Sequence, residues 1–241
     1  YTYNDIFLVP QFTELESRRD ADTSIKLGNL QLSIPFISAN MDTITGPKMA
    51  KTLWNAGAIG SLHRFNDVDG AVNDYLDVKN NDGNKKEGEC IVSIGVNKDY
   101  QERSKQLYDV GARYFVVDVA HGHSLQVKNV LEWLRNEFGD EFTLIAGNVA
   151  TPEAVCDLSK WGADVIKVGV GPGSVCKTRI VTGHGVPQFS CLVECSAAAD
   201  LMGTKIIADG GIRNSGDIVK SFVAGADYGM IGSLLSGTDA T

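Results

Sequence analysis

The sequence predicts a (β/α)8 TIM barrel, a single domain over residues 1–241 in which eight parallel strands are each followed by a helix. Short apolar runs alternate with longer amphipathic segments about eight times, which is the repeat that this α/β fold requires. The apolar runs lack strict alternation, which indicates strands covered on both faces. Polar or glycine-rich residues follow most of the runs, where a barrel places its functional groups. A doubly wound open sheet is the alternative fold.

The predicted elements follow in order from this repeat. The strands are the runs rich in aliphatic and β-branched residues, at 34–38, 58–62, 90–95, 113–118, 143–147, 164–169, 205–208 and 228–232. The helices are the amphipathic segments between them, at 48–56, 101–110, 125–138, 152–161 and 216–224. The interval 63–89, between the second and third strands, has room for one helix and a loop through 80–84. We therefore expect no inserted domain in this interval.

Composition and charge exclude several classes of protein. The formal net charge of −8 and the pI near 5.0 come from scattered charges, so nucleic acid is not an expected partner. The 5 cysteines are odd in number and form no CxxC pair, which argues against a disulfide framework or a zinc site and favours a reducing, cytoplasmic location. No apolar run approaches the roughly 20 residues that span a bilayer, and no signal peptide precedes Tyr1, so no membrane association is expected.

A cysteine lies on a glycine-rich turn directly after the sixth predicted strand. The segment 169–179 reads GVGPGSVCKTR, with the thiol at Cys176. Glycines let the backbone reach positive φ and approach a ligand, and consecutive free N–H groups form a cradle for an anion. The turn therefore suits a phosphorylated substrate beside a thiol nucleophile. The alternative is a structural turn with a small buried cysteine.

The loops after the seventh and eighth predicted strands favour a phosphate site. Barrels often bind phosphate with these two loops. Here Gly210, Gly211, Gly232 and Ser233 offer backbone amides, and Ser174 adds a hydroxyl from the neighbouring loop. The structural alternative treats the glycines as strand stops and Asp209 as a cap for the following helix. The convergence of several such strand ends on one rim favours the phosphate site.

The chain resembles the IMP dehydrogenase and GMP reductase family of purine nucleotide oxidoreductases over essentially its whole length. The motifs that carry the resemblance are YNDIFLVP at 3–10, SANMDT at 38–43, AGNV at 146–149, GPGSVC at 171–176, ADGGIR at 208–213 and MIGS at 230–233. The resemblance implies a TIM barrel, assembled as a homotetramer, that acts on a purine nucleoside monophosphate. It also implies that Cys176 attacks C2 of the purine and that a nicotinamide cofactor exchanges hydride with that carbon.

The same resemblance assigns roles to single residues. Cys176 corresponds to the nucleophile, and Thr178 to the hydroxyl that handles the leaving or attacking group. The positions that resemble nucleotide contacts are Ser38, Met41, Ser174, Asp209, Gly211, Gly232 and Ser233. Of these, Asp209 corresponds to the carboxylate that binds the ribose hydroxyls, and Ser174, Gly211, Gly232 and Ser233 correspond to the phosphate cradle. The positions that resemble the nicotinamide side are Asp118, Val119, Ala120, Asn148 and Gly169. The carbonyls of Gly171, Gly173 and Cys176 resemble a potassium site.

One position in the catalytic loop departs from the family pattern. Lys177 stands where threonine is commoner. A cation beside Cys176 would lower the pKa of the thiol, although adjacent side chains need not point the same way.

The direction of the chemistry rests on smaller features. The short interval 63–89, the NMD run at 40–42 and the segments 182–190 and 193–195 resemble a GMP reductase, which uses NADPH. Residues 120–124 and 233–238 resemble an IMP dehydrogenase instead, which uses NAD. Dehydrogenases of this family usually carry regulatory CBS modules, so the alternative is a dehydrogenase that lacks these modules or whose modules are not included in this chain. We favour the reductase. A barrel that binds a purine nucleotide without converting it is a further alternative.

The resemblance also implies elements that would follow residue 241. In the family a catalytic flap and the eighth helix come after the eighth strand. We therefore expect the natural protein to be longer, and no general acid or base from the flap can be named.

Overall fold

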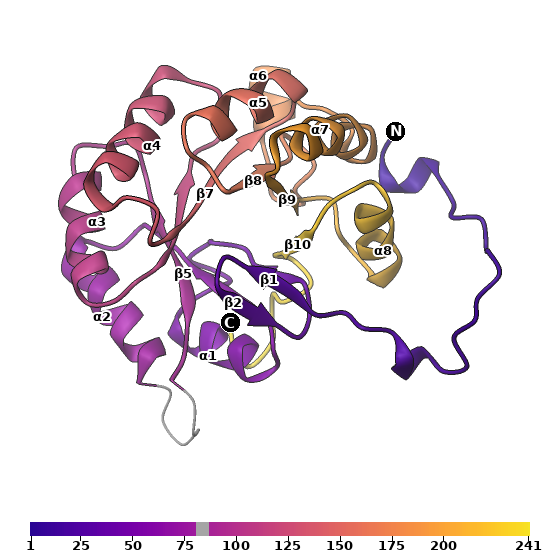
Figure 1. Ribbon diagram of the computed structural model, residues 1–241, viewed down its shortest axis with the longest axis horizontal. Coiled ribbons are helices and arrows are strands. Elements are labelled where there is room, and N and C mark those ends of the chain that lie inside the picture. The colour runs from indigo at the N-terminus through magenta and orange to yellow at the C-terminus, as the bar shows by residue number, and fades with distance from the viewer. Residues whose placement is uncertain (81–86) are drawn as a thin grey trace.

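The computed structural model describes residues 1–80 and 87–241, and confirms the predicted barrel. Eight parallel strands close into a ring in the order β10-β3-β4-β5-β6-β7-β8-β9 (Figure 1). Their bounds are β3 Phe36–Ser38, β4 Ile59–Leu62, β5 Cys90–Ile94, β6 Tyr114–Asp118, β7 Thr143–Val149, β8 Val165–Val168, β9 Lys205–Asp209 and β10 Tyr228–Ile231. The closure excludes the open sheet. Most of the loop expected at 80–84 lies outside the described residues.

Helices surround the barrel and mostly match the predicted segments. Their bounds are α1 Pro47–Asn55, α2 Val68–Lys79, α3 Tyr100–Asp109, α4 Leu125–Phe138, α5 Pro152–Lys160, α6 Thr178–Thr182, α7 Gln188–Met202 and α8 Ser215–Val223. Residues 232–241, which follow β10, form turns and bends.

The helices begin where side chains cap them. Asp67, Ser124, Thr151 and Asn214 each accept a backbone N–H from the first turn of the helix that follows. Each cap closely follows the loop that leaves a strand. The caps therefore keep these loops near the carboxyl-terminal rim of the barrel.

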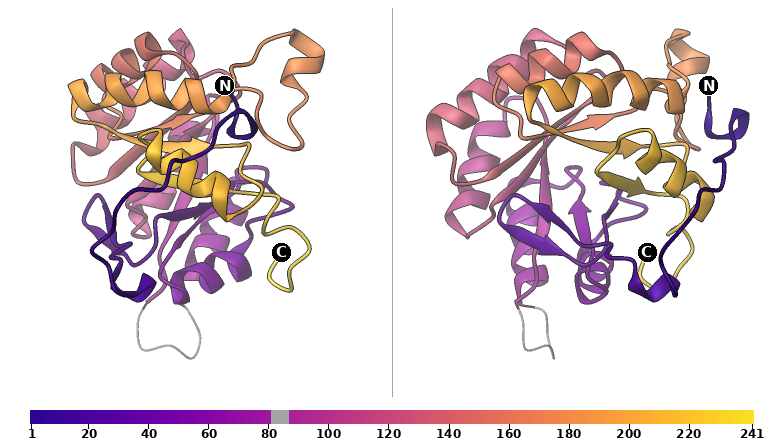
Figure 2. Two further views of the ribbon diagram at one scale, coloured as in Figure 1. Left: turned by 90° about the vertical axis from the view of Figure 1, so that its right-hand side faces the viewer. Right: turned by 45° about the vertical axis from the view of Figure 1, so that its right-hand side comes forward.

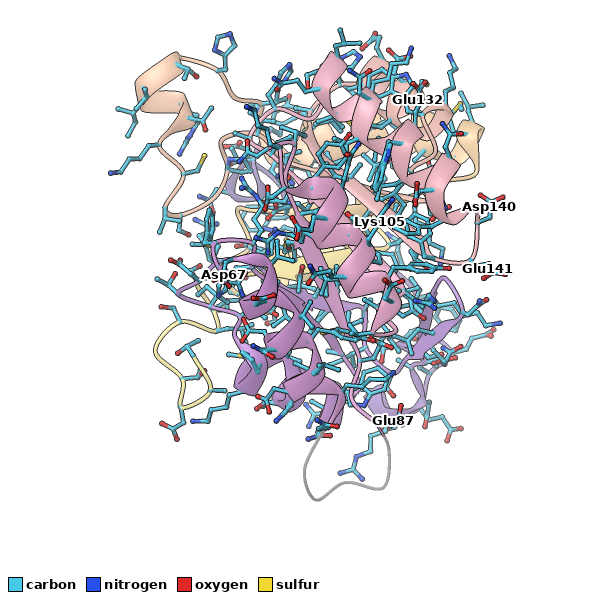
Figure 3. The ribbon with its side chains drawn as sticks, turned by 90° about the vertical axis from the view of Figure 1, so that its left-hand side faces the viewer. Asp67, Glu87, Lys105, Glu132, Asp140 and Glu141 are labelled. Carbon is cyan, nitrogen blue, oxygen red and sulfur yellow. The ribbon has the colours of Figure 1, made fainter. Side chains whose placement is uncertain are left out.

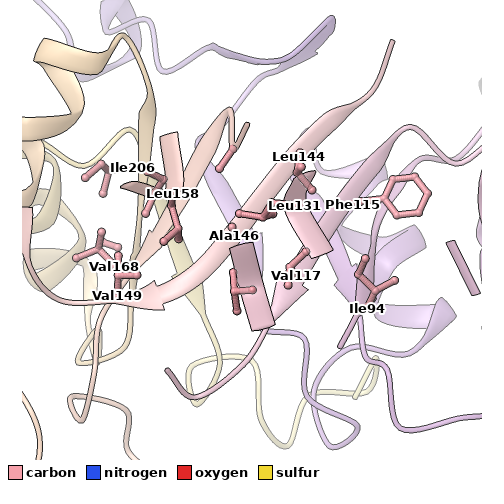
Figure 4. Packing of buried hydrophobic residues seen from close by; sticks show 14 of the residues in the cluster. Ile94, Phe115, Val117, Leu131, Leu144, Ala146, Val149, Leu158, Val168 and Ile206 are labelled. Carbon is pink, nitrogen blue, oxygen red and sulfur yellow. The ribbon is translucent and has the colours of Figure 1, made fainter. Parts of the chain in front are cut away.

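Two apolar layers hold the barrel together. The outer layer packs the outward faces of the strands against the helices, as Figure 4 shows for Val117 and Ala146 beside Leu131 and Leu158. The inner layer fills the barrel itself and includes Ile37, Ile91, Val116, Ile145, Val165, Ile207 and Met230. Because side chains alternate along a strand, the next inward position on several strands is at the carboxyl-terminal end of the barrel.

A small hairpin closes the opposite end of the barrel. β1 (Ile25–Leu27) and β2 (Leu30–Leu32) pair antiparallel and bury Leu27 and Leu32 in the inner layer. The turn between them needs a glycine, because Gly28 has φ +55° and an added Cβ would lie 2.0 Å from Thr143 Oγ1. The hairpin was not predicted, because strands of three residues give almost no periodic signal.

Other parts of the chain lie outside the barrel. Residues 1–24 run along one flank, where Tyr3 is buried and its carbonyl accepts from Lys220 Nζ at 2.7 Å. Figure 2 shows α6 projecting from the barrel on the same side as the C-terminus. The charged side chains labelled in Figure 3 come from several parts of the chain, and apart from the neighbours Asp140 and Glu141 they lie away from one another, in keeping with the scattered charge. Within the described ranges, no helix combines the length and apolar character needed to cross a bilayer.

Candidate active site

A cavity of about 150 Å³ opens at the carboxyl-terminal ends of β9 and β10. Seven of the eight predicted substrate-binding residues line it, namely Met41, Ser174, Asp209, Gly210, Gly211, Gly232 and Ser233. Residues 173–175, in the loop that carries Cys176, form one wall of the cavity. Ser174 Oγ lies 3.3 Å from Ser233 Oγ. The structure therefore brings the loops after the sixth, seventh and eighth barrel strands to one hollow.

The two glycines after β9 shape this cavity. Gly210 and Gly211 have φ values of +95° and +81°, a region that favours glycine. A Cβ on Gly210 would lie 2.9 Å from the backbone nitrogen of Gly173, so this turn packs directly against the loop that carries Cys176. The backbone amides of the turn are thus held beside the cavity, as an anion site requires.

Ser38 is the eighth predicted substrate residue, and the structure places it elsewhere. Side chains alternate along β3, so Ile37 and Ala39 enter the inner layer while Ser38 does not belong to it. Thr45 Oγ1 lies 2.8 Å from the fully buried Ser38 Oγ and 2.6 Å from the Ala39 carbonyl. Ser38 thus fixes the loop after β3 and does not line the cavity.

Cys176 has the surroundings of a reactive thiol. Its Sγ lies 3.2 Å from Thr178 Oγ1, and its amide donates to the Gly173 carbonyl at 3.1 Å, which closes the turn. Partial burial opposes ionisation, but hydrogen bonds with Thr178 and Gly171 and the charge of Arg179 together lower the pKa of Cys176 below its ordinary value. The cation named as acting on the thiol is therefore that of Arg179, the second residue of α6, and not that of Lys177.

The other cysteines lack this environment. Cys90 and Cys195 are fully buried, and their pKa values are raised, by burial for Cys90 and first by the contact with Cys191 for Cys195. None of the five forms a disulfide. Of the thiols whose pKa clearly departs from its ordinary value, only that of Cys176 is shifted toward the reactive thiolate.

The predicted cofactor-side residues gather at the ends of β6, β7 and β8. Asn148 follows a cis peptide bond with Gly147, and its Nδ2 donates to the Gly169 carbonyl at 2.7 Å and to Asp209 Oδ2 at 2.8 Å. The backbone of Val119 pairs with Gly147 and Asn148, and Ala120 is exposed beyond it. Gly169 must be glycine, because a Cβ there would lie 2.0 Å from the Asp209 carbonyl.

Three residues that the sequence did not single out complete the site. Lys167 lies between Asp118 and Asp209, with its Nζ 2.9 Å from Asp118 Oδ1 and 2.7 Å from Asp209 Oδ2. Arg64 Nε donates to the Asp118 carbonyl at 3.2 Å. Gln188 Nε2 donates to the carbonyl of Val168 at 2.9 Å, which ties α7 to the end of β8. A charged residue inside an apolar strand was the available signal for Lys167.

Burial and the ammonium group act against each other on Asp118. Burial favours the neutral acid, but the charge and hydrogen bond of Lys167, with smaller contributions from Asn40 and Arg64, lower the pKa of Asp118 below its ordinary value. Asp118 is therefore a fixed anion. Side-chain metal sites are not indicated, since no group of three or more His, Cys, Asp or Glu side chains able to hold a metal occurs in the described part of the chain.

Comparison with known proteins points to one family. The model of the IMP dehydrogenase / GMP reductase domain matches residues 1–241. GMP reductase from Streptococcus agalactiae serotype Ia is 42% identical over 241 residues, which cover 98% of this chain and 70% of that protein. Inosine-5'-monophosphate dehydrogenase from Cryptosporidium parvum is 38% identical over 276 residues, which cover 99% of this chain and 68% of that protein.

A solved structure agrees with these relatives. The crystal structure of inosine 5' monophosphate dehydrogenase from Legionella pneumophila matches with a TM-score of 0.90 and 43% identity, over 100% of this chain and 71% of that chain. The names of these relatives are those of oxidoreductases that act on IMP or GMP. Fold, site and similarity agree: the chain belongs to the IMP dehydrogenase and GMP reductase family.

Proposed function

We propose that the protein is a GMP reductase, which converts GMP and NADPH to IMP, ammonia and NADP through a covalent bond between Cys176 and C2 of the purine. One observation carries the catalytic part of this proposal, which the reductase and the dehydrogenase share. The Cys176 thiol, whose pKa is lowered and whose Sγ lies 3.2 Å from Thr178 Oγ1, lies on the loop whose residues 173–175 line the cavity. A passive binding site needs the cavity but has no use for an activated thiol.

The chain's own residues support each part of this chemistry. The Cys176 thiolate adds to C2, the C2–N bond breaks, and the departing amine takes up protons and leaves as ammonia. A bound nicotinamide cofactor would supply a hydride to C2, and breaking of the C–S bond would then return the thiolate to Cys176. The Thr178 hydroxyl lies where it can hydrogen-bond the sulfur as the thiolate forms and leaves again.

The cavity fits the sugar and phosphate of the nucleotide. Asp209 Oδ2 is already bonded to Lys167 and Asn148, and no described residue bonds Oδ1. A carboxylate oxygen without a protein donor suits the ribose hydroxyls. The amides after β9 and β10, with the Ser174 and Ser233 hydroxyls, suit the phosphate.

One difference between two of the alignments supports the reductase proposal. The match to the S. agalactiae GMP reductase spans 241 residues for 98% of this chain, so few insertions separate the two proteins. The match to inosine-5'-monophosphate dehydrogenase from Nitrosopumilus maritimus needs 358 residues to cover 99% of this chain, at 30% identity. That relative carries many residues that this chain lacks within the matched region. This supports a barrel without inserted regulatory modules.

IMP dehydrogenase, using NAD and water to form XMP, is the second candidate. The Legionella structure, a dehydrogenase at 43% identity, supports it. The same nucleophile and cavity serve either direction, because both reactions pass through a Cys176 bond to C2.

Further components belong to the proposal. We assign NADPH to the side of Asp118, Asn148 and Gly169, with NAD as the alternative. Potassium would contact the carbonyls of Gly171, Gly173 and Cys176, of which the Gly173 oxygen also accepts the Cys176 amide. Carbonyl oxygens suit this cation, but three are an incomplete shell, so other oxygens must complete it.

A homotetramer in a reducing cytoplasm also belongs to the proposal. Apolar side chains on the N-terminal segment and on α6 support assembly, since Phe7 is 90% exposed and Ile180 is 87% exposed. The five free thiols support a reducing location.

Absorbance at 340 nm tests the proposal directly. The protein is given GMP with NADPH in one cuvette and IMP with NAD in another, both with potassium. We expect NADPH loss that requires GMP and disappears in Cys176→Ala. NADH formation with IMP alone would establish the dehydrogenase instead, and no reaction in either cuvette would favour a non-catalytic nucleotide-binding barrel.

A further inference from the structure

Lys167 is a buried cation shared by two carboxylates. Its side chain is only 4% exposed, and its Nζ lies 2.9 Å from Asp118 Oδ1 and 2.7 Å from Asp209 Oδ2. The two carboxylates belong to opposite sides of the proposed site, Asp209 to the ribose of the nucleotide and Asp118 to the cofactor. Burying a charge costs free energy that the pairing only partly returns, so stability alone is a weak reason for this arrangement.

The strand register makes the contact possible. β6, β7, β8 and β9 are consecutive neighbours, and Asp118 pairs with Gly147, which in turn pairs with Lys167. Lys167 therefore reaches Asp118 across the strand that carries Gly147. An added Cβ on Gly147 would lie 2.6 Å from Lys167 Cβ and 2.5 Å from its carbonyl oxygen. The glycine leaves the space in which the lysine side chain crosses the barrel.

The lysine is a permanent charge and not a proton donor. Burial favours its neutral form, but Asp209 and Asp118 outweigh burial and raise the pKa of Lys167 well above its ordinary value. Lys167 Nζ donates to Asp209 Oδ2, the same oxygen that accepts a hydrogen bond from Asn148 Nδ2 at 2.8 Å. Together these two donors fix the carboxylate plane and leave Oδ1 for a ligand.

We propose that Lys167 is a positioning residue that couples the nucleotide side of the site to the cofactor side by holding Asp209 and Asp118 as a fixed pair of anions. The inference rests on the proposed function, because it takes these two carboxylates as ligand-binding groups. Without the ammonium, two partly buried carboxylates face each other with no positive charge between them. Repulsion between them then moves Asp209 out of position, which weakens its bonds to the ribose hydroxyls.

Nucleotide binding by calorimetry, without cofactor, tests the coupling. The variants are Lys167→Met, Asp118→Asn and the double variant, with Lys205→Met as the control. Lys205 lies on β9 at the opposite end of the barrel, where its Nζ donates to the Lys26 carbonyl at 2.8 Å. Thermal unfolding of each variant accompanies the titrations.

We expect Lys167→Met to lose nucleotide affinity and the double variant to regain it. Lys167→Met weakens GMP or IMP binding by roughly tenfold or more, since an unpaired buried charge is costly. Lys205→Met stays within about twofold of the unmodified protein, and the affinity of Asp118→Asn is the reference for the double variant. The double variant recovers most of the affinity, because the neutral amide that replaces the Asp118 carboxylate no longer repels Asp209. A residue with only a packing role would show no such rescue.

The contrary results are distinct from failure of the proposed function. Lys167→Met binding within twofold of the unmodified protein overturns the inference, as does a double variant no better than the single one. If Lys167→Met fails to fold, the double variant, which loses one charge of each sign, is compared with Asp118→Asn. If the nucleotide affinities of these two variants agree within about threefold, the coupling is supported. A larger loss of affinity in the double variant overturns it. An unmodified protein that binds neither GMP nor IMP overturns the proposed function itself.

Discussion

The two ends of the barrel are built from the same strands but differ in the residues that line them. At the amino-terminal end the inward positions are Tyr114 on β6 and Val165 on β8, both buried with the β1–β2 hairpin in the inner apolar layer. Two to four residues further along, the inward positions are Asp118 and Lys167, which form ion pairs. One end is closed and apolar, whereas the other is charged and opens to the cavity.

The difference shows how a barrel separates stability from chemistry. The closed end removes apolar surface from water, which stabilises the fold. The open end holds buried charges that contribute little net stability but fix the groups that a ligand needs. Substitutions at the two ends should therefore have different effects, and each of the following tests that separation.

The largest effect is expected at the open end, for Cys176→Ala. Removing the nucleophile should lower turnover by about a thousandfold or more, because no covalent bond to C2 can form. Nucleotide affinity should change by less than about threefold, since the cavity walls remain. Turnover at 340 nm and calorimetry measure the two quantities. Cys156→Ala on α5, which removes the other partly buried thiol, is the control, and equal losses in both variants would contradict the assignment.

Leu27→Ala should act only on the closed end. Leu27 is fully buried against the barrel interior, so the cavity left behind should lower the free energy of unfolding by about 2–5 kcal/mol. Urea denaturation measures the loss, and nucleotide affinity at low temperature should not change. Leu201→Ala, at a residue that is 87% exposed, should cost less than about 0.5 kcal/mol. Weakened nucleotide binding in Leu27→Ala would show that the two ends are not independent.

Alkylation of Cys176 should report its lowered pKa. The thiolate is the reactive form, so the rate should rise with pH and reach half its maximum below the ordinary thiol pKa. Thr178→Val removes a hydroxyl that stabilises the thiolate, so the midpoint should move upward. Thr182→Val, whose hydroxyl bonds only the backbone and a nearby histidine on this exposed helix, should leave it in place. An unshifted midpoint in Thr178→Val would contradict the role of that hydroxyl.

The smallest effect is expected for Ser233→Ala. Its hydroxyl is one of several donors proposed for the phosphate, and a single such bond contributes about 0.5–1.5 kcal/mol. Binding of GMP should weaken by roughly two- to tenfold, while binding of guanosine, which has no phosphate, should stay the same. Calorimetry with both ligands separates the outcomes. Equal losses for GMP and guanosine would place Ser233 away from the phosphate.

The fold was largely readable from the sequence, but the centre of the site was not. Strand and helix repeats are local, so the barrel and segments such as Leu125–Phe138 followed from periodicity. The link from Asp118 through Lys167 to Asp209 depends on the barrel closing and on Gly147 leaving space between strands, which no local pattern contains. The inward or outward direction of Ser38 depends on register in the same way.

Protection of Cys176 from alkylation tests the central claim most directly, because it asks whether the activated thiol and the nucleotide cavity are one site. The protein is treated with iodoacetamide with and without GMP, IMP or phosphate alone, and modification is followed at each cysteine by mass spectrometry. We predict that GMP and IMP slow the reaction at Cys176 and leave Cys156 unaffected. Equal rates at Cys176 with and without every purine monophosphate would contradict the site described here.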